Sequence, residues 1–323
     1  MLVGVVVIGR NEGERLRRCL DSVAAQADAV VYVDSGTSDG SIVTARQFGA
    51  DVVELDLSQP FTAARARNVG FQRLYGNGPA IPLVQFVDGD CEVAPGWLRA
   101  ACTLFEGRPE VGVVCGRLRE RFPDRSIYNR LCDMEWDTPV GEALACGGIA
   151  MMRSAALVQA GGFRADLIAG EEPELCVRLR RLGWRIWRLD AEMALHDAAM
   201  TRFSQWWRRA MRAGFAFAEG SRLHGAAPER HWVRETRSAQ VWGLGIPVLV
   251  LAACLVFGPI AALAFLIYPL QIVRLSARRD GPLAERALWA AFIVLAKCAE
   301  AAGQLMFFVS RLTGRRTRLI EYK

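Results

Sequence analysis

Short apolar runs alternate with amphipathic stretches through the first two thirds of the chain. Leu2–Ile8 is a continuous apolar run, and Glu12–Gln26 then carries Leu16, Leu20 and Val23 at helical spacing. A short apolar run bounded by polar residues is typical of a buried strand, whereas spacings of three and four residues are typical of a helix. The chain is therefore predicted to begin with a strand followed by a helix.

The same alternation continues to about residue 190. Further strands are expected at Ala29–Val33, Asp51–Leu55, Pro82–Val87, Val111–Cys115 and Arg185–Leu189, and further helices at Ser41–Phe48, Thr62–Leu74, Pro95–Phe105 and Gly170–Trp184. Gly147–Phe163 is expected to be a strand followed by a helix, and Arg119–Ala145 an irregular loop over a site or an ordinary surface connection. This order predicts an α/β fold with a parallel, Rossmann-like sheet that has helices on both faces.

The pattern changes near residue 240, where the chain becomes almost purely apolar. Val241–Val273 is 33 residues long, whereas one membrane span needs about 20 residues, so the run is too long for one span and tight for two. Gly258-Pro259 lies near its middle, where a turn is favoured. A helical hairpin in a membrane is the economical interpretation.

Basic segments follow the apolar run. The loop "RLSARRDGPLAER" carries four arginines, and the positive-inside rule places it in the cytosol. Leu288–Ser310 is a third apolar stretch, interrupted by Lys297 and Glu300, which are close enough on a helix to pair. Because the tail "RLTGRRTRLIEYK" is also basic, we expect Leu288–Ser310 to be re-entrant or interfacial, with a third full span as the alternative.

The amino-acid composition is consistent with a membrane-associated protein but does not identify a substrate. The chain has 323 residues, 52% of them hydrophobic, and a net charge of +6, which suits an anionic membrane surface or a phosphate-bearing substrate. Nine cysteines without a CxxC pair indicate reduced, buried thiols rather than a zinc or disulfide framework. The N-terminal apolar run is too short for a signal peptide and lacks a basic segment before it, so the N-terminal domain is expected in the cytosol.

Two acids end one of the expected strands. "LVQFVDGDCEV" (Leu83–Val93) contains Asp88 and Asp90, one residue apart. In open α/β sheets ligands bind beyond the carboxyl ends of the strands, so paired carboxylates there could hold a divalent cation. They could also form an ordinary Asp-Gly turn, which is the commoner explanation for such a pair on its own. The neighbouring motifs must decide between the two.

Six motifs occur in a familiar order. They are "VIGRNEGERLRRCLDSV", "VDSGTSDGS", "ARARNVG", "FVDGDCEV", "GGIAMMRSAALVQAGGF" and "GEEPELCVRLRRLGWRI". Over roughly residues 1–220 the chain resembles a family 2 glycosyltransferase with the GT-A fold, and Asp88-Gly89-Asp90 resembles that family's DxD motif. The resemblance implies an inverting enzyme that uses a nucleotide-diphosphate sugar, UDP- or GDP-linked, with Mg²⁺ or Mn²⁺ as a Lewis acid on the departing diphosphate.

The resemblance also implies which residues bind the metal and the diphosphate. Asp90 corresponds to the direct metal ligand, with Asp88 nearer the donor ribose or the metal shell. His196 follows the last strand, where related enzymes often use a histidine near the metal, although a lone histidine is as often a packed residue. Arg67 lies in a motif that the family places near the diphosphate, but an arginine on a helix is usually solvated. Arg208 could neutralise the diphosphate as well.

Further donor contacts are implied at the ends of the first two strands. Asn11 and Glu12 follow the first strand, where the family contacts the nucleotide, although Asn11 also suits a local turn. Asp34 ends the second strand, and Ser35 stands where the family usually has a second acid, which leaves the donor base open. Asp39 is close enough to be a weak candidate, but it also suits the N-cap of the following helix.

The acceptor hydroxyl needs a base, which the family supplies from an "ED" motif that opens a helix. Here Glu171-Glu172 occupy that position, so Glu172 is predicted to be the base, with Glu171 and Glu174 in support. The alternative for all three acids is helix capping and a favourable interaction with the helix dipole.

Aromatic and polar residues further along are candidates for the acceptor. Trp136 lies in the region expected to cover the site, and "SQWWRRAMRAG" resembles the QxxRW motif of processive synthases, with Arg209 in place of its tryptophan. This departure puts processivity in doubt. In that segment Gln205, Trp206 and Trp207 are acceptor candidates, and the alternative is an amphipathic helix on the membrane surface. Glu174 is an acceptor candidate as well.

Together these observations predict a catalytic domain over 1–220, a juxtamembrane linker over 221–240 and membrane-associated helices over 241–323. We expect a multi-pass enzyme of a bacterial-type cytoplasmic membrane that has its catalytic domain in the cytosol. Its expected partners are a nucleotide sugar, a lipid-linked or membrane acceptor in surface polysaccharide or glycolipid synthesis, and membrane lipids, with no nucleic acid. One alternative is a nucleotidyltransferase, but that class requires a glycine-rich N-terminal loop with a lysine, which this chain lacks. The other is a non-enzymatic scaffold, but a scaffold does not need acids at the ends of three separate strands or helices.

Overall fold

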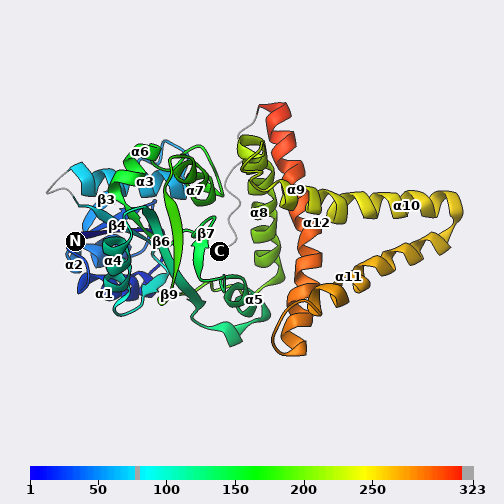
Figure 1. Ribbon diagram of the computed structural model, residues 1–323, viewed down its shortest axis with the longest axis horizontal. Helices are drawn as coiled ribbons and strands as arrows, with labels where there is room; N and C mark the ends of the chain where they lie inside the picture. The colour runs from blue at the N-terminus through cyan, green and yellow to red at the C-terminus, as the bar shows by residue number, and fades with distance from the viewer. Residues whose placement is uncertain (77–80, 315–323) are drawn as a thin grey trace. The chain divides into compact units, whose positions relative to one another are not determined.

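The computed structural model describes residues 1–76 and 81–314, and the chain divides into two compact units (Figure 1). The first unit is Met1–Ala199, and the second begins at Met200. Helix α8 (Phe203–His224) belongs to the second unit, in which it packs along α12 (Leu283–Thr313). The boundary expected at residue 220 therefore falls inside a helix, and the linker expected over 221–240 contains helix α9 (Val233–Ala239).

The first unit is built on one mixed sheet. Within the described residues its strands run in the order β3-β2-β1-β4-β8-β6-β9-β5, and β7 pairs with β9. The bounds are β1 (Val3–Gly9), β2 (Ala29–Asp34), β3 (Asp51–Glu54), β4 (Leu83–Asp88), β5 (Cys91–Val93), β6 (Val111–Glu120), β7 (Gly141–Ala143), β8 (Ala150–Arg153) and β9 (Arg185–His196).

The expected parallel sheet is only partly right. Strands β1 to β4 are parallel to one another, but β8 is antiparallel to both β4 and β6, and β5 and β7 are antiparallel to β9. An apolar run shows that a strand is buried on both faces, but it carries no information about the direction of its neighbours. The antiparallel strands were therefore not visible in the pattern.

Helices pack on this sheet where their apolar positions predicted. They are α1 (Glu14–Ala24), α2 (Ser41–Gln47), α3 (Ala63–Gly76), α4 (Trp97–Gly107), α6 (Ser154–Ala160) and α7 (Glu171–Arg181). Leu16 and Val23 of α1 are fully buried, which confirms the helical spacing. Helix α3 comes very close to β1, because a Cβ on Gly70 would lie 2.3 Å from Val6 Cγ1. This close approach fixes the helix that carries Arg67.

The region expected to be an irregular loop has regular structure. After a short 3₁₀ turn, η1 (Pro123–Arg125), comes helix α5 (Ile127–Glu135), and β7 follows. Ser126 caps α5, since its side chain accepts a hydrogen bond from the Asn129 backbone N–H. The loop prediction was wrong because this serine cap and the short apolar face behind it were not recognised as a helix start.

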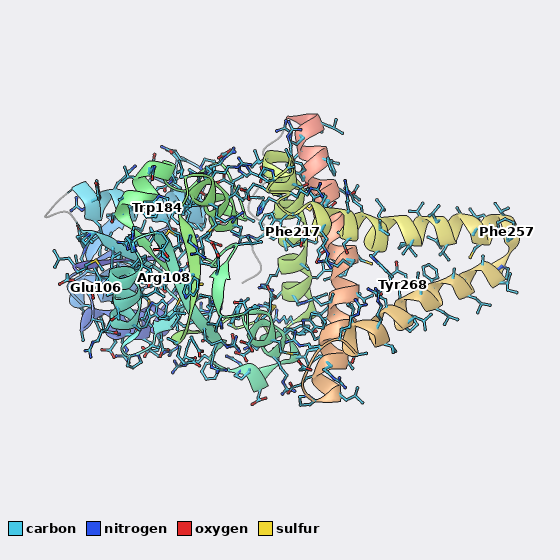
Figure 2. The ribbon with its side chains drawn as sticks, viewed as in Figure 1. Glu106, Arg108, Trp184, Phe217, Phe257 and Tyr268 are labelled. Atoms are coloured by element: carbon cyan, nitrogen blue, oxygen red, sulfur yellow. The ribbon has the colours of Figure 1, made fainter. Side chains whose placement is uncertain are left out.

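The second unit contains the expected helical hairpin. Its arms are α10 (Ile246–Phe257) and α11 (Ile267–Ser276), joined through Gly258 at φ 80° and the 3₁₀ segment η3 (Pro259–Leu266). Figure 2 labels Phe257 at the far end of α10, where the side chain is 73% exposed. In the described part of the chain three helices are long and apolar enough to cross a membrane: Val233–Phe257, Pro259–Ser276 and Leu283–Thr313.

The third apolar stretch is one unbroken helix. Helix α12 runs for 31 residues without turning back, so the re-entrant interpretation is wrong, while an interfacial helix and a full span both fit. Lys297 Nζ lies 2.7 Å from Glu300 Oε2, which confirms the expected pair. Glycines bring the neighbouring backbones together, because a Cβ on Gly303 would lie 1.9 Å from the Met211 carbonyl oxygen of α8.

Candidate active site

The Asp88-Gly89-Asp90 motif lies where β4 ends and β5 begins. The Gly89 N–H donates to the Ile8 carbonyl oxygen at 2.8 Å, which ties the motif to the end of β1. A Cβ on Gly89 would lie 3.2 Å from both Ile8 O and Glu12 Cγ. Any larger residue would push against the end of β1, so the glycine permits a close approach that brings Glu12 beside the two acids.

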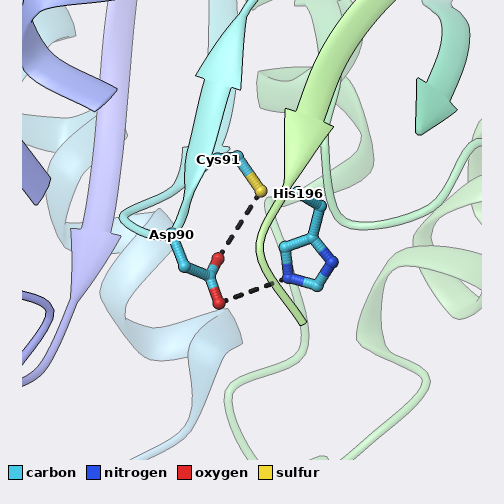
Figure 3. A group of neighbouring side chains, drawn as sticks. All are labelled: Asp90, Cys91 and His196. Atoms are coloured by element: carbon cyan, nitrogen blue, oxygen red, sulfur yellow. Dashed lines mark hydrogen bonds and ion pairs between the residues drawn. The ribbon is translucent and has the colours of Figure 1, made fainter. Parts of the chain in front are cut away.

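Asp90 and His196 form the first cluster of the site (Figure 3). Because β5 and β9 pair antiparallel with Cys91 opposite His196, the end of β9 lies beside the motif. Asp90 Oδ2 lies 3.2 Å from His196 Nε2, and the Cys91 thiol donates to Asp90 Oδ1 at 3.5 Å. Asp90 is 4% exposed. The Trp136 ring, just after α5, lies 4.8 Å from the imidazole ring, so three predicted residues meet here.

Arg67 forms the second cluster by joining two carboxylates. Its Nη2 donates to Asp88 Oδ1 at 2.9 Å and its Nη1 donates to Glu171 Oε1 at 2.6 Å. The Arg67 side chain is 4% exposed, so the solvated alternative is wrong. Burial acts to lower the pKa of Arg67, but the charges of Asp88 and Glu171 outweigh it and raise that pKa. The guanidinium therefore stays charged and links β4, α3 and α7 at one edge of the sheet.

The loop after β2 is shaped by side chains predicted to bind the donor. Asp34 Oδ2 accepts hydrogen bonds from the backbone N–H groups of Gly36 and Thr37, both at 2.9 Å, and its Oδ1 accepts from the Tyr32 hydroxyl. Asn11, at φ 56°, accepts from the Ser38 N–H through its side-chain oxygen. Asp34 and Asn11 thus hold the two loops at the ends of β1 and β2 in place.

Asp39 joins the same loop to the start of α1. Its Oδ2 accepts from the Gly13 N–H at 3.1 Å, and its Oδ1 accepts from the N–H of Ser41, the first residue of α2. The N-cap position itself is Gly40, one residue later than the capping alternative placed it.

Glu172 is enclosed by the loop before β8. Its Oε1 accepts from the Cys146 N–H at 2.8 Å and from the thiols of Cys146 and Cys176, and its Oε2 accepts from the Gly147 N–H at 2.9 Å. The residue is 3% exposed, and burial raises the pKa of its carboxyl group. A carboxylate oxygen readily accepts two hydrogen bonds. Oε1 already accepts more than that, whereas among the described residues Oε2 accepts only the one from Gly147, so Oε2 has the greater capacity to receive a proton.

Glu174 and Gln205 have local structural partners. Glu174, 1% exposed, pairs with Arg178 at 2.8 Å, and Arg178 also donates to the Gly162 carbonyl oxygen, so this acid anchors α7 to the end of α6. Gln205 accepts from the backbone N–H groups of Thr201 and Arg202 in a capping box at the start of α8. Both residues therefore have a local structural role, and the acceptor contacts predicted for them stay predictions.

The remaining predicted residues belong to the second unit. Trp206 is 7% exposed and packs edge-on against Phe292 of α12 with ring centroids 4.8 Å apart. Trp207 is half-buried beside Trp206, and Arg208 is exposed. Trp206 is therefore a packing residue, while contacts of Trp207 and Arg208 with a sugar or diphosphate stay predictions.

Two features of the site were missed. A Cβ on Gly148 would lie 2.7 Å from Arg67 Nη2, so this glycine leaves room for the buried guanidinium. Glu120, at the end of β6, is 3% exposed and accepts from the Ala198 N–H, next to His196 in space, and burial raises its pKa. The Gly147-Gly148 pair was a visible signal of a close approach, whereas Glu120 had none.

Comparisons with known proteins agree with this geometry. Residues 4–156 match the family described as Glycosyl transferase family 2. Glycosyltransferase AglE of Haloferax volcanii is 23% identical over an alignment 324 residues long, which covers 95% of this chain and 96% of AglE.

Solved structures share the fold. The mannosyltransferase PcManGT from Pyrobaculum calidifontis, in complex with GDP-Man and Mn²⁺, has a TM-score of 0.58 and 21% identity over 97% of this chain and 87% of its own. S. aureus TarS 1–349, in complex with UDP-GlcNAc, has a TM-score of 0.53 and 16% identity over 98% of this chain and 93% of its own. The motif order, the acids at the strand ends and the family match lead to one conclusion: the chain is a glycosyltransferase that carries a family 2 domain.

Proposed function

We propose that this protein transfers a sugar from a nucleoside diphosphate sugar to a membrane-associated, lipid-linked acceptor in surface polysaccharide or glycolipid synthesis, with inversion at the anomeric carbon. The observation that carries the proposal is the pair of clusters at one edge of the sheet, Asp90 with His196 and Asp88 with Arg67 and Glu171. The similar solved structures contain GDP-Man with Mn²⁺ or UDP-GlcNAc, so a UDP- or GDP-sugar is the donor class that we infer.

The chemistry of the ligands suits Mg²⁺ or Mn²⁺. Neighbouring ligands of an octahedral ion lie about 3.0 Å apart when each metal–ligand distance is about 2.1 Å. The separation of 3.2 Å between Asp90 Oδ2 and His196 Nε2 fits that spacing. The Cys91 sulfur is a soft ligand and suits these hard ions poorly. Asp90 and His196 would therefore hold the ion, which would stabilise the negative charge of the leaving diphosphate.

The chain's own residues prepare the donor site. Arg67 keeps the Asp88 carboxylate in a fixed orientation, and the Asp88 side chain is 37% exposed, so it can still meet a donor hydroxyl group. Glu12 lies beside the same motif. Asp34, Asn11 and Asp39 hold the two loops that we infer surround the nucleoside. In this proposal they act mainly by shaping the loops.

Glu172 is the base that we propose for the acceptor hydroxyl. Burial raises its pKa, which moves a carboxylate toward the range where it accepts a proton efficiently near neutral pH. The contacts to the Cys146 and Gly147 backbone fix its orientation. Glu171 interacts with Arg67 and supports the same helix start. A single displacement by the acceptor oxygen, with its proton passing to Glu172 Oε2, inverts the anomeric carbon.

The membrane assignment rests on the second unit. Three of its helices are long and apolar enough to cross a membrane by length and composition. The exposed apolar side chains at the hairpin tip, Leu255 at 90% and Phe257 at 73%, suit a hydrocarbon environment. We propose a multi-pass enzyme of a bacterial-type cytoplasmic membrane, oriented with the first unit in the cytosol, where nucleotide sugars are available. Trp136, Trp207 and Arg208 are our remaining candidates for acceptor or diphosphate contacts.

A panel of labelled UDP- and GDP-sugars, incubated with the full-length protein and bacterial membranes, tests the proposal. Incorporation of label into extractable lipid, together with release of nucleoside diphosphate, is the expected result. Glu172→Gln should lower the rate by about 10²–10⁴-fold without loss of donor binding, and Glu172→Asp should retain part of the rate. The control is Glu142→Gln, because that side chain is 55% exposed in a surface ion pair. An undiminished rate for Glu172→Gln would assign the base to another residue, and absence of transfer from every donor would refute the function.

A further inference from the structure

A groove within the second unit has no role in the proposed sugar transfer. Two cavities of about 450 Å³ and 430 Å³ both have Arg234, Ser238 and Trp242 in their linings. The larger one lies among α9, α11 and α12, and the smaller one follows α9 into the π-helical turn η2 (Gln240–Gly245). We call these two adjoining cavities the α9 groove.

One end of the α9 groove is strongly basic. Arg230, Arg234 and Arg237 line it, and all three residues are exposed. In residues 1–76 and 81–314 none of the three guanidinium groups has a hydrogen bond or ion pair to another residue. Glu235 is the one carboxylate among the described residues that line the groove. Three cations thus face the same cavity wall with a single acid near them, which favours an anionic ligand.

The other end of the groove is apolar. Leu275, Ile293 and Val294 line it together with Trp242 and Trp289. The Tyr268 hydroxyl donates to the Trp242 carbonyl oxygen, which joins α11 to this turn. Lys297 also lines this end, but its charge is met by Glu300 at 2.7 Å. The walls here suit a hydrocarbon chain.

The order of these groups matches the depth profile of a membrane. The helix Val233–Phe257 is long and apolar enough to cross, with Arg234 and Arg237 in its first turns and Trp242 further along. Arginines at the end of a span lie at headgroup level, tryptophans at the interface and aliphatic side chains deeper. A soluble anion would use only the basic end of the groove, and an uncharged lipid only the apolar end.

We propose that the α9 groove is a binding site for a membrane lipid with a phosphate headgroup. Arg234 and Arg237 bind the phosphate oxygens, because the planar guanidinium group matches phosphate geometry with paired N–H donors. The lipid chains lie against Trp242 and Val294. This site does not depend on which sugar or acceptor the first unit uses, so it can fail or stand independently of the proposed function.

Native mass spectrometry of the full-length protein in mild detergent, titrated with dioleoyl phosphatidic acid, tests this site. We expect one saturable lipid, bound at least tenfold more weakly by Arg234→Gln/Arg237→Gln. The matched control is Arg274→Gln/Arg278→Gln, which removes two exposed arginines from the end of α11 and the residues after it, outside the groove. The control should bind within twofold of the natural protein.

A second pair of variants tests the apolar end of the groove. Ile293→Trp fills the larger cavity and should also weaken lipid binding at least tenfold, whereas Leu295→Trp on the same helix, 39% exposed and outside the lining, should not.

Three results would overturn the proposal. If Arg234→Gln/Arg237→Gln and Arg274→Gln/Arg278→Gln weakened lipid binding equally, the lipid would be attracted by the overall positive charge and not by the groove. Displacement of the lipid by the same concentration of inorganic phosphate would make the ligand a soluble anion. Equally tight binding of dioleoylglycerol would remove the role of the headgroup.

Discussion

Replacing Arg67 with methionine tests whether one buried cation holds the acids at the edge of the sheet. Methionine keeps much of the side-chain volume but removes both hydrogen bonds, at 2.6 Å to Glu171 and 2.9 Å to Asp88. Asp88 and Glu171 then lose the partner that offsets the cost of holding their charges near the protein interior. The substitution should therefore loosen α3, β4 and α7 together.

The magnitude follows from the exposure of the three side chains. Removing one partner of a buried ion pair costs about 3–5 kcal/mol. Arg67 and Glu171 are 4% and 12% exposed, but the Asp88 side chain is 37% exposed, so water replaces part of its lost interaction. We therefore expect a loss of local stability at the lower end of that range, about 3 kcal/mol. This corresponds to roughly 150-fold faster hydrogen exchange at the amides that exchange through local opening.

Hydrogen exchange with mass spectrometry of the full-length protein in detergent is the suitable assay, because it reports local stability and does not require both units to unfold together. Peptides covering Leu83–Asp88 should exchange faster in Arg67→Met. The matched control is Arg73→Met on the same helix, where the ion pair with Asp51 is 47% and 43% exposed and contributes about 0–1 kcal/mol. If Arg67→Met loosened β4 no more than Arg73→Met does, the buried cation would not hold the site.

Three further predictions concern the site and the helices. Gly148→Ala should slow sugar transfer at least tenfold, because a Cβ there would lie 2.7 Å from Arg67 Nη2, and a normal rate would show that the guanidinium can move at no cost to catalysis. Because burial raises the pKa of Glu172, kcat/KM should fall as the pH drops through this raised pKa, which lies above 4.5. The contribution of Glu172 to the free energy of unfolding should be complete below pH 4.5 and should be lost as the pH rises through the raised pKa. Glu172→Gln should abolish both effects, and a rate independent of pH in the natural enzyme would contradict the assignment. Gly303→Leu should lower the stability of the second unit by about 1–3 kcal/mol, since a Cβ would lie 1.9 Å from the Met211 carbonyl oxygen, and an unchanged melting temperature in detergent would refute this close packing.

The local elements of the first unit were predictable because each depends on a short pattern. The apolar runs Leu2–Ile8 and Pro82–Val87 predicted strands whose bounds lie within one residue of β1 and β4, and Leu16, Leu20 and Val23 predicted α1. Gly258, at φ 80°, gave the turn of the hairpin. In each case a single local feature of the sequence, either the spacing of apolar residues or a glycine, is enough to predict the strand, helix or turn.

The assembly of the site was harder to predict, because it depends on long-range pairing. Asp90 meets His196 only because β5 pairs antiparallel with β9, and no local pattern indicates that pairing. The contact of Glu172 with Cys146 likewise depends on the conformation of a loop 26 residues away in sequence. The interactions of Asp34 with Gly36 and Thr37 are different, since an aspartate before a glycine is a turn signal that could have been recognised.

Binding of a nucleoside diphosphate with and without Mn²⁺ tests the central claim most directly, because it separates the metal site from transfer and from the acceptor. Titration calorimetry on the full-length protein should show tight binding of GDP or UDP with Mn²⁺ and weak binding with EDTA. Asp90→Asn should lose this metal response, while Asp124→Asn, a surface carboxylate that is 88% exposed, should keep it. An Asp90→Asn protein that binds the nucleotide with the full Mn²⁺ response would contradict the claim that Asp90 and His196 hold the ion.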